Sequence, residues 1–481
     1  MRVLFVSAEV APYAKVGGLG DVAAALPRAL ADLGVEIAVV TPKYRMVTER
    51  AGNLTPVATF PVAVGGEVRT CQAFRGSLSR SEVPLYALGC DPLFDRPGIY
   101  GEGGGGYPDE LERFAFLARA ALDLGPASGW LPDVVHANDW HTALIPVYLR
   151  AELAAPARSV LTIHNLAYQG SFPRARGENL GLNSVGWQLV TRGDQINLLQ
   201  GGIQAADWIT TVSPSYAREI LTQGEGLEEV LRARRDQLTG ILNGIDTVVW
   251  DPSSDPHLWA PYSAADPSGK YENKRSLQTA LGLAPADGPL VAMVSRLAEQ
   301  KGFDLVLTAF ERMMALGIQF VVLGEGDPRY ASFFRGAERR YPGRVRALIQ
   351  FSEEWAHRIE AGADLFLMPS RFEPAGLNQL YSLRYGTVPV VRATGGLSDT
   401  IHDYDPVTDS GNGFTFTDYT AEAMLSALSR AVRLWRSDRG AWRRLMVRGM
   451  GEDHSWAVPA RQYCALYERV LAGRIPRLTE P

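Results

Sequence analysis

The chain has few cysteines and few lysines. Its three cysteines, among 481 residues, follow no metal-ligand spacing: Cys71, Cys90 and Cys464. The sequence therefore predicts neither a disulfide framework nor a zinc site, and a reducing cytoplasm is the simplest location. Five of the 48 basic residues are lysines, namely Lys15, Lys43, Lys270, Lys274 and Lys301. Lysine is a compact point charge where arginine is a planar fork, so each lysine suggests a site that needs a point charge.

Long apolar runs and an excess of positive charge are also missing. No apolar run reaches the length of a membrane span, and the first strand pattern, Val3–Val6, is too short for the core of a signal peptide. We expect a soluble, unprocessed protein. The net charge of −5 gives no broad basic surface, which argues against nucleic acids and anionic membranes as partners.

Strand and helix patterns alternate along the chain, which predicts an α/β fold with parallel sheets and crossover helices. In the first half, strands are expected at 3–7, 35–41, 134–137, 159–164 and 208–212, and a helix at 21–33. In the second half, strands are expected at 290–295, 320–323, 345–351, 365–368 and 388–391, and a helix at 303–316. The length and the 46% hydrophobic content suit two large domains.

The domain boundaries are predicted from composition. Residues 251–270 are rich in proline, serine and aspartate, as linkers are. We predict an N-terminal domain of residues 1–245, a C-terminal domain of residues 246–455, and a last amphipathic stretch, 456–481, that could cap either domain. The glycine-rich segment 98–108 is too polar for a core and is expected to be a mobile loop, either functional or merely permissive.

The segment Arg371–Gln379 carries the most information, because an acid, a proline and a glycine follow a buried strand pattern. Glu373 should lie at the carboxyl end of a parallel strand, where α/β sheets bind ligands. A helix is expected from Pro374, and Gly376 would let a ligand approach the backbone. The alternative is an ordinary helix start with an acidic residue in its first turn.

Two glycine pairs, Gly17-Gly18 and Gly395-Gly396, each follow a strand and open a helix. Helix-start amides of this kind bind anions and sugar hydroxyls, although a plain tight turn explains either pair. The first pair lacks the dinucleotide-binding spacing, and no acid follows the second strand. Hydride-transfer chemistry is therefore disfavoured.

Arg296 and Lys301 follow the strand at 290–295. Together they would suit a diphosphate that gains negative charge as it leaves, and a solvated loop is the alternative. No acidic metal-binding cluster accompanies them, so we expect neither a metal nor another cofactor.

The chain resembles bacterial glycogen synthases and plant starch synthases over nearly its whole length. The resemblance is carried by Lys15–Asp21, His136–His141, Thr162–Gly170, Asn243–Asp246, Arg296–Gly302, Arg371–Gln379 and Thr394–Asp399. It implies a GT-B fold of two Rossmann-like domains facing across a cleft, with the C-terminal helix crossing back to the first domain. It also implies transfer of glucose from ADP-glucose to the non-reducing end of an α-1,4-glucan such as glycogen, with retention of configuration.

The resemblance assigns roles to individual residues. The catalytic set would be Lys15, Asp139, His164, Arg296, Lys301 and Glu373. The donor would contact Lys15, Gly17, Gly18, Asn243, Arg296, Lys301, Phe351, Gly376, Leu377, Thr394, Gly395 and Gly396. The glucan acceptor would contact Tyr100, Trp140, His141, Asn165, Tyr168 and Gln169.

Several of these residues have structural alternatives. His141 and His164 could be satisfied structural histidines, Trp140 could pack in a core, and Asp139 could cap the helix that follows it. Phe351 could be the last core residue of its strand. The chain also departs from related enzymes: Tyr381 stands where many retaining GT-B enzymes have a second glutamate, and Ala375 where bacterial synthases often have cysteine.

Two other functions stay open. One is a retaining GT-B transferase with another donor or a small acceptor. The other is a non-catalytic glucan-binding protein. Lys15, Arg296, Lys301 and Glu373 argue against it, since binding a polysaccharide needs no diphosphate clamp.

Overall fold

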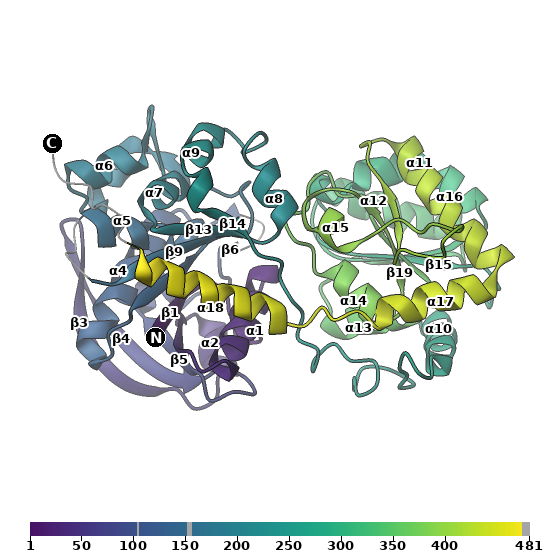
Figure 1. The fold of residues 1–481 in the computed structure, drawn as a ribbon, viewed down its shortest axis with the longest axis horizontal. Helices are drawn as coiled ribbons and strands as arrows, with labels where there is room; N and C mark the ends of the chain where they lie inside the picture. Colours follow the sequence, from purple (N-terminus) through teal and green to yellow (C-terminus); the bar gives the residue numbers. More distant parts are fainter. Residues whose placement is uncertain (103–104, 152–155, 474–481) are drawn as a thin grey trace. The chain divides into compact units, whose positions relative to one another are not determined.

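The structure is a computed structural model that describes residues 1–102, 105–151 and 156–473 (Figure 1). Parts of the predicted loop 98–108 and of the predicted C-terminal segment 456–481 lie outside the described residues. The chain divides into two compact units. Unit 1 combines Met1–Gly244 with the segment that starts at Trp456, and unit 2 is Ile245–Ser455.

Unit 1 contains a nine-stranded sheet in the order β14-β13-β9-β8-β1-β2-β5-β4-β3. Its strands are β1 (Arg2–Val6), β2 (Glu36–Pro42), β3 (Thr55–Val64), β4 (Glu67–Ser77), β5 (Pro84–Gly89), β8 (Val134–Asn138), β9 (Arg158–Ile163), β13 (Trp208–Thr211) and β14 (Leu238–Gly240). Strands β2, β1, β8, β9 and β13 pair in parallel, as predicted. The hairpin β3–β4 pairs antiparallel and was not predicted.

Helices cover this sheet, and the last one returns to it. The larger helices are α1 (Gly18–Asp32), α4 (Glu110–Ser128), α5 (Leu144–Ala151), α7 (Leu198–Ala205) and α18 (Ala457–Ala472). Figure 1 shows α18 alongside α1, and the two helices are in contact. The hydroxyl of Tyr467 on α18 lies 2.7 Å from Nδ1 of His136, which is fully buried on β8. The C-terminal helix is thus part of the unit 1 core.

Shorter elements complete unit 1. They are α2 (Arg45–Arg50), α3 (Asp91–Phe94), α6 (Ser184–Val190), α8 (Pro214–Glu219), α9 (Glu228–Ala233), β6 (Gly101–Glu102), β7 (Gly105–Gly106), β10 (Ser171–Pro173), β11 (Thr191–Arg192) and β12 (Gln195–Asn197). Three 3₁₀ turns lie at Trp140–Thr142, Arg174–Leu180 and Arg235–Gln237.

Unit 2 is built on a six-stranded parallel sheet in the order β17-β16-β15-β18-β19-β20. Its strands are β15 (Leu290–Val294), β16 (Gln319–Leu323), β17 (Val345–Leu348), β18 (Leu365–Met368), β19 (Val388–Arg392) and β20 (Phe414–Phe416). Its helices are α10 (Ser268–Ala280), α11 (Phe303–Ala315), α12 (Pro328–Arg340), α13 (Glu353–Gly362), α14 (Asn378–Arg384), α15 (Gly395–Thr400), α16 (Ala421–Ser437) and α17 (Arg439–Met450), with a 3₁₀ turn at Glu299–Lys301. The central strands are apolar throughout because helices bury both faces of the sheet. The α/β prediction is confirmed.

Two local predictions in unit 2 are wrong. Strand β17 ends at Leu348, and Phe351 beyond it is 69% exposed, so Phe351 is not the last core residue of its strand. Helix α14 begins at Asn378, four residues after Pro374. Gly376 has φ +64°, a left-handed conformation that interrupts a helix, so Glu373 lies in an irregular loop and not at a helix start.

The proline- and serine-rich segment 251–270, predicted as a linker, lies within unit 2. The preceding Trp250 stacks between His357, with ring centroids 3.7 Å apart, and Tyr381, at 3.8 Å. Tyr381 is thus a buried aromatic ring that holds Trp250 in place. Among the described residues, no helix combines the length and apolar character needed to cross a bilayer.

Candidate active site

The predicted site residues of unit 1 follow three neighbouring parallel strands, β9, β8 and β1. Lys15 follows β1, Asp139 follows β8, and His164 follows β9. The carboxyl ends of parallel strands meet at one sheet edge, so these residues share that edge. The chain also reverses its strand order here, since β2 lies on one side of β1 and β8 on the other, and α/β sheets bind ligands at such a switch point.

The loop after β1 is held by Glu9, a residue that the sequence reasoning did not single out. Glu9 is 4% exposed, and its Oε2 accepts hydrogen bonds from the amides of Val16 (2.7 Å) and Gly17 (2.9 Å). Burial raises the pKa of Glu9 above its ordinary value. The Lys15 ammonium lies 2.7 Å from a carboxylate oxygen of Asp21 on α1. An acid three residues after a buried strand was the signal that could have pointed to Glu9.

Asp139 holds the loop that follows β9. It is buried, has φ +58°, and its Oδ1 accepts hydrogen bonds from the amides of His164 (2.7 Å) and Asn165 (3.3 Å). Its side chain makes no capping hydrogen bond to its own helix, so the capping alternative is wrong. Burial raises the pKa of Asp139 to about 7 although the two amides oppose that shift.

His164 is oriented by Asn138, a second residue that the sequence reasoning missed. Asn138 donates from Nδ2 to the carbonyl of Val6 (3.0 Å), which turns its Oδ1 toward Nε2 of His164 at 2.9 Å. Burial lowers the pKa of His164, so the ring is neutral at pH 7. Its proton then lies on Nε2, where it donates to Asn138, and Nδ1 is left as a hydrogen-bond acceptor.

Tyr100, Trp140 and His141 form an aromatic wall with Phe114. The His141 ring stacks on Tyr100 with centroids 4.9 Å apart and lies 4.2 Å from Trp140. Gly170 lies against Trp140, since a Cβ there would be 2.3 Å from the indole. Within the described part of the chain, Nδ1 of His141 is buried without a hydrogen-bond partner, which a satisfied structural histidine would not show. Trp140 is 7% exposed and packed in this wall, and its contact with an acceptor stays a prediction.

The other predicted acceptor residues lie in the loop after β9. Asn165 accepts from the amide of Ala167 (3.1 Å), and Tyr168 is half exposed. Gln169 uses its side-chain amide within unit 1, donating to the carbonyls of Leu166 and Glu225 and accepting from Asn197 at 2.6 Å. Of the donor residues predicted in unit 1, Asn243 is buried at the end of the unit, and no described residue hydrogen-bonds to its Oδ1.

In unit 2 the predicted residues follow strands β17, β15, β18 and β19, all parallel. Lys301, after β15, contacts both carboxylate oxygens of Glu373, after β18, at 2.9 and 2.7 Å. Ser370 also donates to Glu373, at 2.9 Å, and was missed by the sequence reasoning. The pair lies where the strand order reverses between β15 and β18. Arg296 is exposed on the same edge, and its guanidinium lies 3.4 Å from Oε1 of Gln300.

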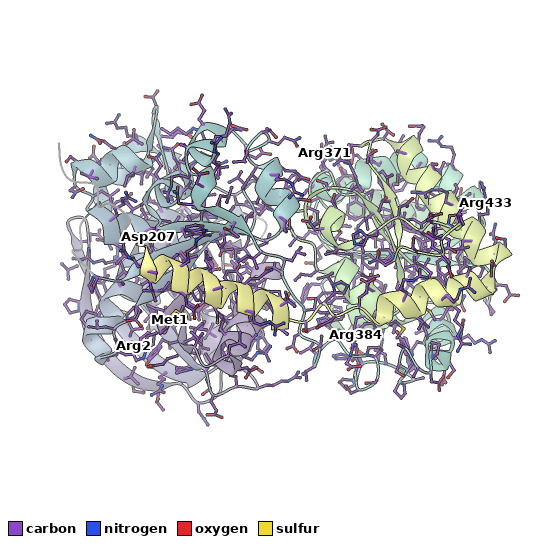
Figure 2. The ribbon with its side chains drawn as sticks, in the orientation of Figure 1. Met1, Arg2, Asp207, Arg371, Arg384 and Arg433 are labelled. Carbon is purple, nitrogen blue, oxygen red and sulfur yellow. The ribbon has the colours of Figure 1, made fainter. Side chains whose placement is uncertain are left out.

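Arg371 stabilises the loop that carries Glu373. Its guanidinium lies over the ring of Tyr419 at 4.3 Å and is 3.0 Å from a carboxylate oxygen of Glu299, while its amide donates to the carbonyl of Gln300 (2.8 Å). Figure 2 labels Arg371 on unit 2, together with Arg384 on α14. Arg371 is therefore engaged in holding the β15 and β18 loops together.

The two glycine pairs differ in their packing. At Gly395, φ is +47° and a Cβ would lie 2.0 Å from the carbonyl oxygen of Glu373, while at Gly396 it would lie 2.1 Å from that of Ala375. These glycines are required for the Glu373 loop to pack on α15. A Cβ at Gly17 would meet no atom within 4 Å, so packing does not explain that glycine.

The remaining predicted donor residues flank these elements. Thr394 is buried at the start of α15, and Leu377 is half-buried before α14. Phe351 is exposed after β17, at the same sheet edge. Within the residues that the structure describes, no group of three or more His, Cys, Asp or Glu side chains could hold a metal ion.

Two α/β units, each with charged loops at the switch point of its parallel strands, are typical of the GT-B fold of glycosyltransferases. Residues 2–233 match the family described as "Starch synthase catalytic domain", and residues 279–443 match "Glycosyl transferases group 1". The chain belongs to the glycogen synthase and starch synthase family, and we conclude that it is a glycosyltransferase with a glycogen or starch synthase function.

The relatives cover nearly the whole length of the chain. Glycogen synthase from Anaeromyxobacter dehalogenans (strain 2CP-C) is 52% identical, over 98% of this chain and 100% of its own. Glycogen synthase from Syntrophotalea carbinolica is 44% identical, over 98% of this chain and 99% of its own. The catalytic domain of starch synthase IV from Arabidopsis thaliana, bound to ADP and acarbose, superposes with a TM-score of 0.91 at 37% identity, covering 98% of this chain and 99% of that one. Sucrose-phosphate synthase from Thermosynechococcus elongatus, at 18% identity and a TM-score of 0.62 over 98% of this chain and 99% of that one, shows the fold alone.

Proposed function

We propose that the protein transfers glucose from ADP-glucose to the non-reducing end of an α-1,4-glucan such as glycogen, with retention of configuration. The observation that carries this proposal is the pairing of Lys301 with Glu373 at the switch point of unit 2, beside the exposed Arg296. Two cations at a strand end suit a diphosphate leaving group, because their charge stabilises the negative charge that develops there. The ADP in the related starch synthase supports the choice of nucleotide.

In this proposal residues of both units contact the donor, and most of them belong to unit 2. Arg296 and Lys301 neutralise the donor diphosphate, and Glu373 contacts the donor sugar or ribose. The exposed ring of Phe351 suits stacking on the adenine, and Gly17 leaves room for a phosphate or sugar beside the Lys15 loop. Asn243, Gly18, Gly376, Leu377, Thr394 and the pair at Gly395 complete the proposed donor contacts.

The acceptor side of the proposal rests on unit 1. Nδ1 of His164 can accept a hydrogen bond from a glucose hydroxyl, because the proton of the neutral ring is committed to Asn138. Tyr100, Trp140, His141, Asn165, Tyr168 and Gln169 form the proposed glucan-binding wall, with Asp139 holding the loop of His164 in place. We also propose that the protein acts in the cytoplasm, where its unbonded cysteines would stay reduced.

The test is incorporation of label from ADP-glucose into precipitable polymer, with and without glycogen. We expect incorporation that requires glycogen, with α-linked product by NMR. Two substitutions of substrate test the competing GT-B activities. UDP-glucose replaces ADP-glucose as the donor, and sucrose-forming small acceptors replace glycogen. Glu373→Gln is the matched control and should lose most incorporation while melting like the wild type. Label in a small soluble product, or β-linked polymer, would contradict the proposal.

A further inference from the structure

Glu9 links two loops of unit 1 through one buried carboxylate. Its Oε2 accepts from the amides of Val16 (2.7 Å) and Gly17 (2.9 Å), and its Oε1 accepts from the hydroxyl of Tyr100 at 2.6 Å. A buried carboxylate is tolerated when donors satisfy its oxygens, and bonds to a charged acceptor are about twice as strong as neutral ones. Val16 and Gly17 lie in one segment, and Tyr100 lies more than eighty residues later in the sequence.

The amide side of this link sets the backbone just before α1. Gly17 has an extended backbone, and no side-chain cap closes the start of the helix. A Cβ at Gly17 would meet nothing within 4 Å, so side-chain packing on that face does not fix the residue. The Glu9 carboxylate holds the two amides, and the Lys15–Asp21 ion pair holds the lysine of the same segment.

The hydroxyl side of the link reaches the aromatic wall. The Tyr100 ring stacks on His141 with centroids 4.9 Å apart and an interplanar angle of 25°. A hydrogen bond from the hydroxyl to a buried carboxylate limits rotation of that ring. The same acid therefore orients the Lys15 loop and the Tyr100 ring.

We propose that Glu9 is a positioning residue that couples the donor-side loop Lys15–Gly17 to the acceptor-side ring of Tyr100. It acts by the reach of its side chain and its hydrogen bonds, and it contributes no charge to the reacting atoms. This proposal rests on the proposed function, which assigns Lys15 to the donor and Tyr100 to the acceptor.

Two substitutions separate reach from charge. Glu9→Gln keeps the length of the side chain: its oxygen can accept from both amides and its nitrogen can donate to the Tyr100 oxygen. Glu9→Asp keeps the charge but is one methylene shorter and cannot span both loops. A positioning role predicts that Gln retains kcat/KM within about threefold and that Asp loses roughly tenfold or more, since a shift of about 1 Å can cost up to 10²-fold in rate. A role for the charge in the chemistry predicts the reverse order.

Asp207 provides a matched structural control. It accepts from the amide of Ser159 (2.7 Å) at the amino end of β9, opposite the site edge, and Figure 2 labels it in unit 1. Asp207→Ala should lower the unfolding temperature and leave the KM for ADP-glucose within about twofold, as expected for a residue that acts on stability alone. Tyr100→Phe removes one bond of the link and should raise the KM for glycogen with a smaller effect on ADP-glucose.

Steady-state kinetics with ADP-glucose and glycogen test the proposal, together with hydrogen exchange of the Val16 and Gly17 amides. Exchange should be faster in Glu9→Asp than in the wild type and near the wild-type rate in Glu9→Gln. Slow exchange in Glu9→Asp, or lower kcat/KM in Gln than in Asp, would overturn it. An inactive wild type would refute the proposed function instead, and the exchange rates would still decide whether Glu9 holds the loop.

Discussion

Phe351 offers a test in which stability and ligand binding give separate answers. Its side chain is 69% exposed after the end of β17, so folding buries only about a third of the ring. A phenylalanine carries roughly 200 Å² of side-chain surface, so Phe351→Ala removes about 60 Å² of burial. At about 25 cal/mol per Å² this costs at most about 1.5 kcal/mol of unfolding free energy, well below the roughly 3–5 kcal/mol of a core phenylalanine.

The ligand effect should be larger than the stability effect. If Phe351 stacks on the adenine, its loss weakens ADP binding by about 1–3 kcal/mol, or roughly 5- to 150-fold. Phe351→Tyr keeps the ring and should stay near the wild type. Tyr271→Ala is a matched control, because Tyr271 is another exposed aromatic of unit 2, at 53%, and is assigned no ligand.

Calorimetric titration with ADP and denaturant unfolding of the same four proteins decide between the outcomes. Weaker ADP binding in Phe351→Ala alone, with nearly wild-type stability, supports the stacking. Unchanged ADP binding in that variant would remove Phe351 from the donor site. A stability loss above about 3 kcal/mol would refute the reasoning from exposure.

Three further predictions follow from the geometry. Gly395→Ala should lower the unfolding free energy by at least about 1–3 kcal/mol, since a Cβ would lie 2.0 Å from the Glu373 carbonyl. Gly17→Ala should leave the unfolding free energy unchanged and lower activity. Melting curves and activity assays of the two variants test this. Lys301→Ala should lower kcat by roughly 10²- to 10³-fold, and a loss below about fivefold would contradict its role as a charge-stabilising donor. It should also lower the melting temperature, because the buried Glu373 carboxylate loses its cation. Burial lowers the pKa of His136 to about 3, whereas an unfolded histidine titrates near 6.5. As the pH falls, the unfolded chain therefore binds a proton before the folded chain does. The folded state loses stability between about pH 6.5 and pH 3. Denaturation at pH 7 and pH 5 should therefore show a smaller loss for His136→Gln than for the wild type.

The fold could be predicted because the central strands are buried on both faces. Runs such as Leu365–Met368 are apolar throughout, and each is followed by a polar or glycine-rich turn, so their type and position were clear. The hairpin β3–β4 was missed because it has another pattern: one face is exposed, and Pro56 and Pro61 interrupt β3. Neither feature resembles a buried parallel strand.

In each unit the predicted site residues follow parallel strands, whose carboxyl ends share one sheet edge. The strand pattern in the sequence was therefore enough to place them at that edge. What each side chain contacts could not be predicted. Glu9 and Asn138 act on partners from distant segments, Tyr100 and Val6, and no local pattern marks such pairs. The loop around Glu373 was predicted as a helix because Gly376 fits a helical pattern in sequence and leaves it only in its backbone angle.

The partners of the buried acids indicate how the work is divided between the units. Glu9 and Asp139 each give a carboxylate oxygen to two main-chain amides, so replacing either acid changes the path of a loop. The carboxylate of Glu373 contacts two side-chain groups, the Lys301 ammonium and the Ser370 hydroxyl. A charged ligand can therefore replace these partners without moving the backbone. The acids of unit 1 are thus suited to shaping a surface, and the acid of unit 2 is suited to exchanging partners with a charged substrate.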